Sequence, residues 1–220
     1  MTMKPIVLPV GMIDTNCYIL RTEQGSGVMI DPGADSERIM NVLQTNDITL
    51  KMILLTHGHF DHIGALREVY NATNAQVFVS QKDAELLTDP VKNVGARFSH
   101  CPEQYQLSDV PVFRKVVHGD TIALDELSFT VFETPGHTNG SVVYILGDMM
   151  FTGDTLFQGS IGIVTHYGGD LATEIASVKR LADELSGDYI VYPGHGSDTT
   201  LDIERRTNPY MGKASYDDCF

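Results

Sequence analysis

The sequence contains few cysteines and no apolar segment long enough to span a bilayer. Cys17, Cys101 and Cys219 are odd in number, widely spaced and without a CxxC pair, so the sequence predicts neither a disulfide framework nor a thiolate zinc site. The amino terminus also lacks the apolar stretch of a signal peptide. We therefore expect a cytoplasmic protein that does not act at a membrane.

Basic residues are scarce as well. Fifteen lysines and arginines stand against 29 acidic residues, which gives a formal net charge of −14. Non-specific binding to nucleic acid or to an anionic membrane needs a basic face, so the sequence predicts neither partner. The hydrophobic fraction of 42% is typical of a globular protein, and 220 residues suffice for one large core. We expect a single domain over residues 1–220.

Short apolar segments and turn residues predict two groups of strands, each followed by alternating helix and strand. The expected strands cover residues 6–10, 17–22, 28–31, 51–56, 76–79, 112–117, 121–124, 128–133, 142–146, 149–152 and 189–192. A first helix is expected to begin at Asp35. Further helices are expected over residues 62–73, 82–87 (capped by Ser80) and 171–185. Residues 89–111 form either a lid or a partly ordered insertion, and a polar tail ends the chain. Two facing sheets with helices outside would give a four-layer αββα sandwich of the α/β class.

One segment, residues 56–62, concentrates side chains that bind metals. Within six positions it contains His57, His59, Asp61 and His62. Imidazole and carboxylate are the usual ligands of a borderline divalent ion. If the strand over 51–56 continues, His57 and His59 leave the chain on the same side, and Asp61 and His62 begin the following helix. The spacing therefore predicts a metal site.

Three later strands end on a glycine followed by another ligand-type residue. These pairs are Gly136-His137, Gly153-Asp154 and Gly194-His195. Each pair alone is equally typical of a turn or a helix cap. Because active sites of layered α/β proteins gather at one edge of the sheet, we expect all three side chains to join the first cluster.

Seven candidate ligands exceed the four that one zinc ion takes. Two ions that share Asp154 would use all seven, one bound by His57, His59 and His137 and the other by Asp61, His62 and His195. We expect two divalent ions, zinc in the first place, with iron or manganese as alternatives. Asp31 and Thr56 stand where partners of ligating histidines are expected, although ordinary turn residues would also fit there.

These motifs resemble the metallo-β-lactamase superfamily, and in particular its hydroxyacylglutathione hydrolase (glyoxalase II) branch. The resemblance covers residues 31–33, 56–62, 136–137, 153–155, 156–162, 193–196 and 204–210. It implies the αββα fold, a metal pair at the sheet edges and the division of ligands given above. It does not fix the substrate, because this superfamily includes thioesterases, lactamases, lactonases, nucleases and oxygenases.

Two features depart from that branch. Full-length glyoxalase II has a further C-terminal helical region that helps to hold glutathione, and this chain ends at Phe220 without one, like short bacterial relatives. Relatives also tend to have an arginine and an acidic residue after the Gly-Ser-x-Gly turn, where this chain continues with Ile163. We expect a narrowed or shifted specificity from the second difference. His166, just beyond, is the histidine outside the ligand set that we expect near the mouth.

The expected activity is hydrolysis of a small-molecule thioester, S-lactoylglutathione or a related acyl-thiol. Two divalent ions can lower the pKa of a shared water from about 15.7 toward 7, and the resulting bridging hydroxide attacks the thioester carbonyl. Asp61 would orient this nucleophile through a hydrogen bond. A net charge of about +1 on the loaded centre would tolerate an anionic substrate.

Other functions stay open. A mononuclear iron enzyme of the persulfide dioxygenase kind would use His57, His137 and Asp154. Another hydrolase of the same fold would cleave a lactone or a different ester. A protein that keeps metal for stability alone would melt in a metal-dependent way without turnover. A nuclease would need a basic groove, which the net charge of −14 disfavours.

Overall fold

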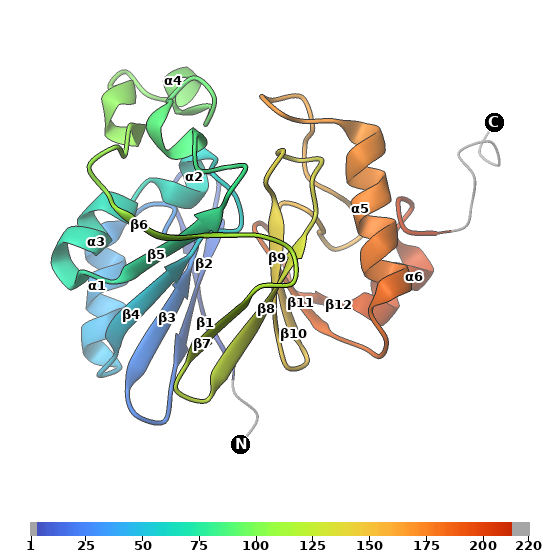
Figure 1. Ribbon diagram of the computed structural model, residues 1–220, viewed down its shortest axis with the longest axis horizontal. Helices are drawn as coiled ribbons and strands as arrows, with labels where there is room; N and C mark the ends of the chain where they lie inside the picture. Colours follow the sequence, from blue (N-terminus) through green and yellow to red (C-terminus); the bar gives the residue numbers. More distant parts are fainter. Residues whose placement is uncertain (1–3, 213–220) are drawn as a thin grey trace.

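Two six-stranded β-sheets face each other in the computed structural model, which describes residues 4–212 (Figure 1). The first sheet, in the order β1-β2-β3-β4-β5-β6, consists of β1 (Ile6–Val10), β2 (Thr15–Arg21), β3 (Ser26–Ile30), β4 (Thr49–Leu54), β5 (Gln76–Ser80) and β6 (Val112–Val116). The second, in the order β12-β11-β10-β9-β8-β7, consists of β7 (Thr121–Leu124), β8 (Leu127–Glu133), β9 (Val142–Leu146), β10 (Met149–Gly153), β11 (Ile190–Pro193) and β12 (Thr199–Thr200).

Helices cover the outer face of each sheet (Figure 1). The helices α1 (Ser36–Thr45) and α3 (Leu66–Thr73) pack on the first sheet, and α5 (Leu171–Glu184) and α6 (Leu201–Thr207) pack on the second. The layers are therefore helix, sheet, sheet and helix, which confirms the predicted αββα sandwich. No helix within residues 4–212 has the length and apolarity needed to cross a membrane.

The strand β4 shows how the core determines this layering. Met52 and Leu54 point into the apolar cluster between the sheets, whereas Ile53 points into the cluster beneath α1 and α3. A strand buried on both faces needs an almost continuous apolar sequence, which is why this segment is recognisable. The large aromatic side chains of Tyr144 and Phe151 fill the space between the sheets, and each such burial stabilises the fold by about 1.5–3 kcal/mol.

Strand direction brings the proposed ligand segments to one edge. The strands β3 and β4 are parallel, and so are β10 and β11. Because β8 and β10 are both antiparallel to β9, they run in the same direction as each other. Backbone hydrogen bonds join the two sheets at this edge: Asn16 N donates to Gly194 O at 2.7 Å, and Val142 N donates to Thr56 O at 2.9 Å.

The predicted helix over residues 62–73 is wrong. The segment contains two helices, α2 (Phe60–Ile63) and α3, and α2 begins directly after His59. A Cβ atom on Gly64 would lie 2.3 Å from Gly33 O, and Ala65 N donates to Pro32 O at 2.9 Å. The chain bends at Gly64 because it packs against the loop that follows β3.

The predicted helix over 82–87 is also wrong. The segment forms turns that lead into the 3₁₀-helix η1 (Leu86–Thr88). The side chain of Asp83, which a surface helix would expose, is fully buried and accepts a hydrogen bond from Gly58 N at 3.0 Å. This contact with the loop after β4 replaces the regular helix.

Two further segments contain more structure than their sequences indicate. Residues 89–111 include the short helices α4 (Gly95–Phe98) and η2 (Pro102–Tyr105), and Arg67 links this region to α3 through Asp109 at 2.8 Å. The predicted polar tail contains β12 and α6, held by the buried carboxylate of Glu204, which accepts from Thr199 Oγ1 at 2.8 Å. The other predicted strands and helices agree with the structure to within two residues at each end.

Candidate metal centre

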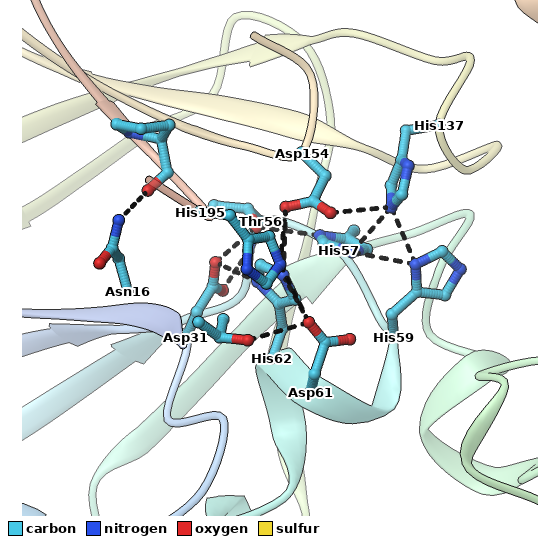
Figure 2. Close-up of polar contacts among 12 residues, drawn as sticks. Asn16, Asp31, Thr56, His57, His59, Asp61, His62, His137, Asp154 and His195 are labelled. Carbon is cyan, nitrogen blue, oxygen red and sulfur yellow. Dashed lines mark hydrogen bonds and ion pairs between the residues drawn. The ribbon is translucent and has the colours of Figure 1, made fainter. Parts of the chain in front are cut away.

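All seven candidate ligands meet at the edge where the two sheets come together (Figure 2). Four of them follow β4, and one each follows β8, β10 and β11. Their ligand-type atoms form three overlapping groups in which these atoms all lie within 4.8 Å of one another. The groups are His57, His59 and His137; His57, His62 and Asp154; and Asp61, His62 and His195.

The first group is a triangle of imidazole nitrogens. His57 Nε2 lies 3.1 Å from His59 Nδ1, and His137 Nε2 lies 3.1 Å from His57 Nε2 and 2.8 Å from His59 Nδ1. All three rings are buried. The two histidines of the 56–62 segment do converge, although β4 itself ends before them.

The second group places nitrogen against carboxylate. Asp61 Oδ2 lies 3.3 Å from His62 Nε2 and 3.2 Å from His195 Nε2. Asp154 stands between the two groups: its Oδ1 lies 3.2 Å from His62 Nε2, and its Oδ2 lies 3.6 Å from His137 Nε2. One carboxylate thus offers one oxygen to each group.

Hydrogen bonds on the outer side of the rings fix which nitrogen points inward. Four of the five histidines place Nδ1 beside an oxygen of the chain: His57 beside Thr56 Oγ1, His62 beside Asp31 Oδ2, His137 beside Ile163 O and His195 beside Ile13 O. An oxygen acceptor at Nδ1 requires the proton on that nitrogen in a neutral ring. We infer that Nε2 of each of these rings carries a lone pair directed into the centre.

This arrangement fits a cation and little else. Lone pairs on His62 Nε2 and His195 Nε2 face the negative oxygens of Asp61 and Asp154, which is repulsive without an intervening positive charge. His62 Nε2 and Asp154 Oδ1 are buried atoms without a hydrogen-bond partner among the described residues. Buried polar atoms are rarely left without a partner, so these donor sets suit divalent metal ions.

The electrostatics of the two groups differ. Burial lowers the pKa of His57 well below 6.5 and that of His59 to about 3, so both rings are neutral and able to bind a metal. Burial also acts to lower the pKa of His62, but the carboxylates of Asp61 and Asp154 raise it well above 6.5. The second group therefore attracts positive charge, whether a proton or a metal ion.

Asp31 and Thr56 lie where the sequence predicts partners of the histidines. Asp31 accepts from Thr56 N at 2.8 Å and from Thr56 Oγ1 at 2.6 Å, in addition to its contact with His62. Asp31 holds a left-handed backbone with φ of 52°, which is uncommon outside glycine. These side-chain contacts hold it there.

The close approach of Gly194 to the centre explains one of the glycines in the repeated motif. A Cβ atom at Gly194 would lie 2.2 Å from Asp154 Oδ1 and 2.8 Å from His62 Cε1. Only a residue without a side chain leaves room for both groups.

Three contributing residues were not predicted. Thr15 Oγ1 donates to Asp61 Oδ2 at 3.0 Å, and Glu174 Oε2 accepts from His137 N at 2.7 Å. Asp83 accepts from Gly58 N behind the same loop. In the sequence, Thr15 looks like part of a strand, Glu174 like part of a first helical turn and Asp83 like part of a surface helix. None of these patterns indicates a role at the metal centre.

A cavity of about 310 Å³ opens over the centre. Its lining includes five of the candidate ligands: His59, Asp61, His137, Asp154 and His195. His166 lines it too, with its ring 5.8 Å from that of His59, as expected from the sequence. The centre is therefore accessible to a small molecule.

Comparison with known proteins places the chain in a family. The model of the metallo-beta-lactamase superfamily matches residues 10–195. The chain belongs to this superfamily. Hydroxyacylglutathione hydrolase GloC of Haemophilus influenzae is 32% identical over 95% of this chain and 98% of its own length.

Solved structures agree with this placement. The chain is similar to BLEG-1, a B3 metallo-beta-lactamase, with a TM-score of 0.88 and 35% identity over 94% of this chain and 99% of that one. It is also similar to TTHA1623 in a di-iron-bound form, with a TM-score of 0.78 and 34% identity over 93% and 99% of the two chains. The family and the His/Asp cluster together indicate an enzyme that binds divalent metal.

Proposed function

We propose that this protein is a binuclear metallohydrolase that cleaves a thioester, S-lactoylglutathione or a related acyl-thiol. The observation that carries the proposal is the position of Asp154, whose two oxygens face two separate groups of ligands. A single ion would leave several of the seven candidate ligands unused. We propose zinc as the natural metal and iron or manganese as alternatives, since the same donor set accepts all three.

In this proposal the seven candidate ligands form two metal sites. His57, His59 and His137 would hold one ion, and Asp61, His62 and His195 the other, with Asp154 shared. When bound, such ions supply a water of lowered pKa and polarise a carbonyl oxygen.

Asp61 would in addition orient the attacking water. Its Oδ2 is held by Thr15 Oγ1 at 3.0 Å, and its side chain borders the cavity. A thiolate is a good leaving group that needs little protonation. This suits a cavity whose candidate bases are already committed to metal binding.

The relatives support this choice without deciding the substrate. GloC is named as a hydroxyacylglutathione hydrolase, which favours an acyl-thiol, and a di-iron form of TTHA1623 favours two metal positions. BLEG-1 is named as a B3 metallo-beta-lactamase, which favours a scaffold that also serves a different, ring-opening hydrolysis. A lactone or another ester is accordingly the nearest alternative substrate.

A mononuclear iron enzyme of the persulfide dioxygenase kind is the second candidate, and it would use His57, His137 and Asp154. The observation that favours it is that His137 Nε2 lies 3.1 Å from His57 Nε2 and 3.6 Å from Asp154 Oδ2, so the three side chains converge. It leaves His59, Asp61, His62 and His195 without a metal role.

Metal analysis combined with a substrate panel tests the proposal. The purified protein, stripped and then reloaded with zinc, manganese or iron, is assayed with S-lactoylglutathione, other thioesters, a lactone and glutathione persulfide. The proposal expects two ions per chain and thioester hydrolysis that disappears on stripping. One iron per chain with oxygen consumption on the persulfide would replace it with the second candidate.

A further inference from the structure

A second cavity continues from the one above the metal centre. It has a volume of about 330 Å³, and it shares Ile13, Phe60, Asp61 and Phe98 with the first cavity. The shared wall is aromatic, because the rings of Phe60 and Phe98 stack at 4.7 Å and Tyr105 meets Phe60 edge-on at 5.5 Å. Together the two cavities form one two-lobed apolar site that leads away from the proposed ligands.

Apolar side chains at the rim of this site are unusually exposed. Phe98 is 50% exposed, Ile13 47% and Ile163 63%. Exposed apolar groups that gather beside a polar centre mark a binding site more often than an ordinary surface. The metal centre lies at the floor of one lobe, so a bound molecule can place its reacting carbonyl there and an apolar arm along the wall.

Apart from the histidines and the ions they would hold, the charged side chains that line the site are carboxylates. Asp35 and Asp61 line the second lobe, Asp61 and Asp154 line the first, and among the described residues no lysine or arginine lines either one. Carboxylate recognition in proteins relies on arginine or lysine partners. In the second lobe, away from the metal centre, an anionic substrate arm would therefore meet no basic side chain as a counter-charge.

Basic side chains outside the linings are engaged with other groups, and Arg38, beside the second lobe, donates to Pro9 O at 2.6 Å. Arg67 binds Asp109 at 2.8 Å, and Lys92 binds Glu85. Arg97 precedes Phe98 on α4 but is exposed and outside both linings. A carrier such as glutathione, which bears two carboxylates, finds no guanidinium or ammonium group within the two lobes.

We propose that the two-lobed site selects an uncharged thioester with an apolar arm of several carbons. This inference rests on the proposed thioester hydrolysis and narrows its substrate class. Phe98 and Ile13 determine the specificity by forming the wall along which the arm lies. Each methylene buried there strengthens binding by up to about fourfold.

Binding of non-hydrolysable thioethers tests the inference independently of turnover. The probes are N-acetyl-S-hexylcysteamine, its S-methyl analogue and S-hexylglutathione, titrated calorimetrically into the metal-loaded protein and into the metal-free protein. We expect the neutral hexyl probe to bind at least about tenfold more tightly than the methyl probe, and more tightly than S-hexylglutathione. Equal or tighter binding of S-hexylglutathione, or no effect of chain length, would overturn the inference.

Two pairs of variants locate the effect. Phe98→Ala should remove most of the advantage of the hexyl arm and leave the methyl probe unchanged. Phe113→Ala removes an equally exposed phenylalanine outside both lobes and should change neither. Ile13→Lys should strengthen binding of S-hexylglutathione, whereas Val91→Lys adds the same charge outside both linings and should not.

A turnover experiment separates this inference from the proposed function. Hexanoyl thioesters of N-acetylcysteamine and of glutathione are compared with the metal-loaded protein, with the neutral one expected to give the higher kcat/KM. A preference for the glutathione thioester would contradict the inference and leave thioester hydrolysis standing. Selective binding of the neutral hexyl probe without hydrolysis of any thioester would contradict the proposed function and support the apolar site.

Discussion

The carboxylate of Asp31 lies 2.9 Å from His62 Nδ1, and both side chains are buried. The same carboxylate also accepts hydrogen bonds from the backbone N–H and the hydroxyl of Thr56. One residue at the end of β3 thus fixes the tautomer of a candidate ligand and the path of the loop that carries three more.

Asp31→Asn should weaken metal binding by about tenfold to a hundredfold. The amide NH₂ would face either the backbone N–H of Thr56 or, in the other orientation, both the Nδ1 proton of His62 and the hydroxyl of Thr56, so at least one hydrogen bond would be lost. Competition with a chromophoric chelator measures the change. Asp35→Asn is the matched control, since Asp35 also has a positive φ of 54° but its side chain, within residues 4–212, accepts only from Gly11 N. Unchanged affinity in Asp31→Asn would contradict the role given to this contact.

His57→Ala and Asp154→Ala should each lower the bound metal and reduce thioester hydrolysis to background. His57 belongs to two of the three ligand groups, and Asp154 is the group that faces both halves of the centre. Elemental analysis and a thioester assay check the two effects. His166→Ala removes another imidazole beside the same cavity and should keep its metal. Full activity in either ligand variant would count against the mechanism.

Removal of metal should destabilise the fold. The ligand set brings uncompensated carboxylates together. An ion that binds only the folded chain stabilises it by an amount that grows with the logarithm of its concentration, about 2.7 kcal/mol at a hundred times the dissociation constant. Calorimetry with added zinc and with a chelator should give a clear fall in Tm on chelation. The variant Asp154→Ala should show a smaller fall, because it binds less metal at the start.

Asp83 should make stability depend on pH. Burial raises the pKa of its carboxyl from 3.8 to about 6 in the folded protein. The folded state therefore holds a proton that the unfolded state has released, and this stability is present below pH 4 and lost as the pH rises through about 6. Between pH 5 and pH 8 the loss is roughly 1–2 kcal/mol.

Asp83→Asn isolates this effect, because asparagine can still accept from Gly58 N and Thr138 Oγ1 without ionising. Urea unfolding of both proteins at pH 5, 6, 7 and 8 gives the comparison. As the pH rises, the free energy of unfolding of the variant should increase relative to that of the original protein. Parallel curves would show that Asp83 titrates normally.

Much of the fold could be predicted because its signals are local. An almost continuous apolar segment identifies β4, and five apolar residues at helical spacing identify α5. The failures come from contacts made far along the chain. Gly64 breaks a helix because Gly33 O lies against it, and α6 forms around the buried carboxylate of Glu204. Neither contact leaves a trace in the neighbouring sequence.

The residues of the candidate centre also separate into those that the sequence predicts and those that it does not. Its seven predicted members share a signature, a strand end followed by a ligand-type side chain, and the direction of the strands brings such ends together. Thr15 and Glu174 act through single hydrogen bonds across the molecule. Residue type alone does not distinguish them from the many other threonines and glutamates of the chain.

The first four ligands lie in the half of the chain that builds one sheet, and the other three lie in the half that builds the second. An ion held by both sets is a cross-link between distant parts of one polypeptide. Cross-links that close long loops remove the most freedom from an unfolded chain. Metal supply would then govern how long this protein survives proteolysis as well as whether it reacts.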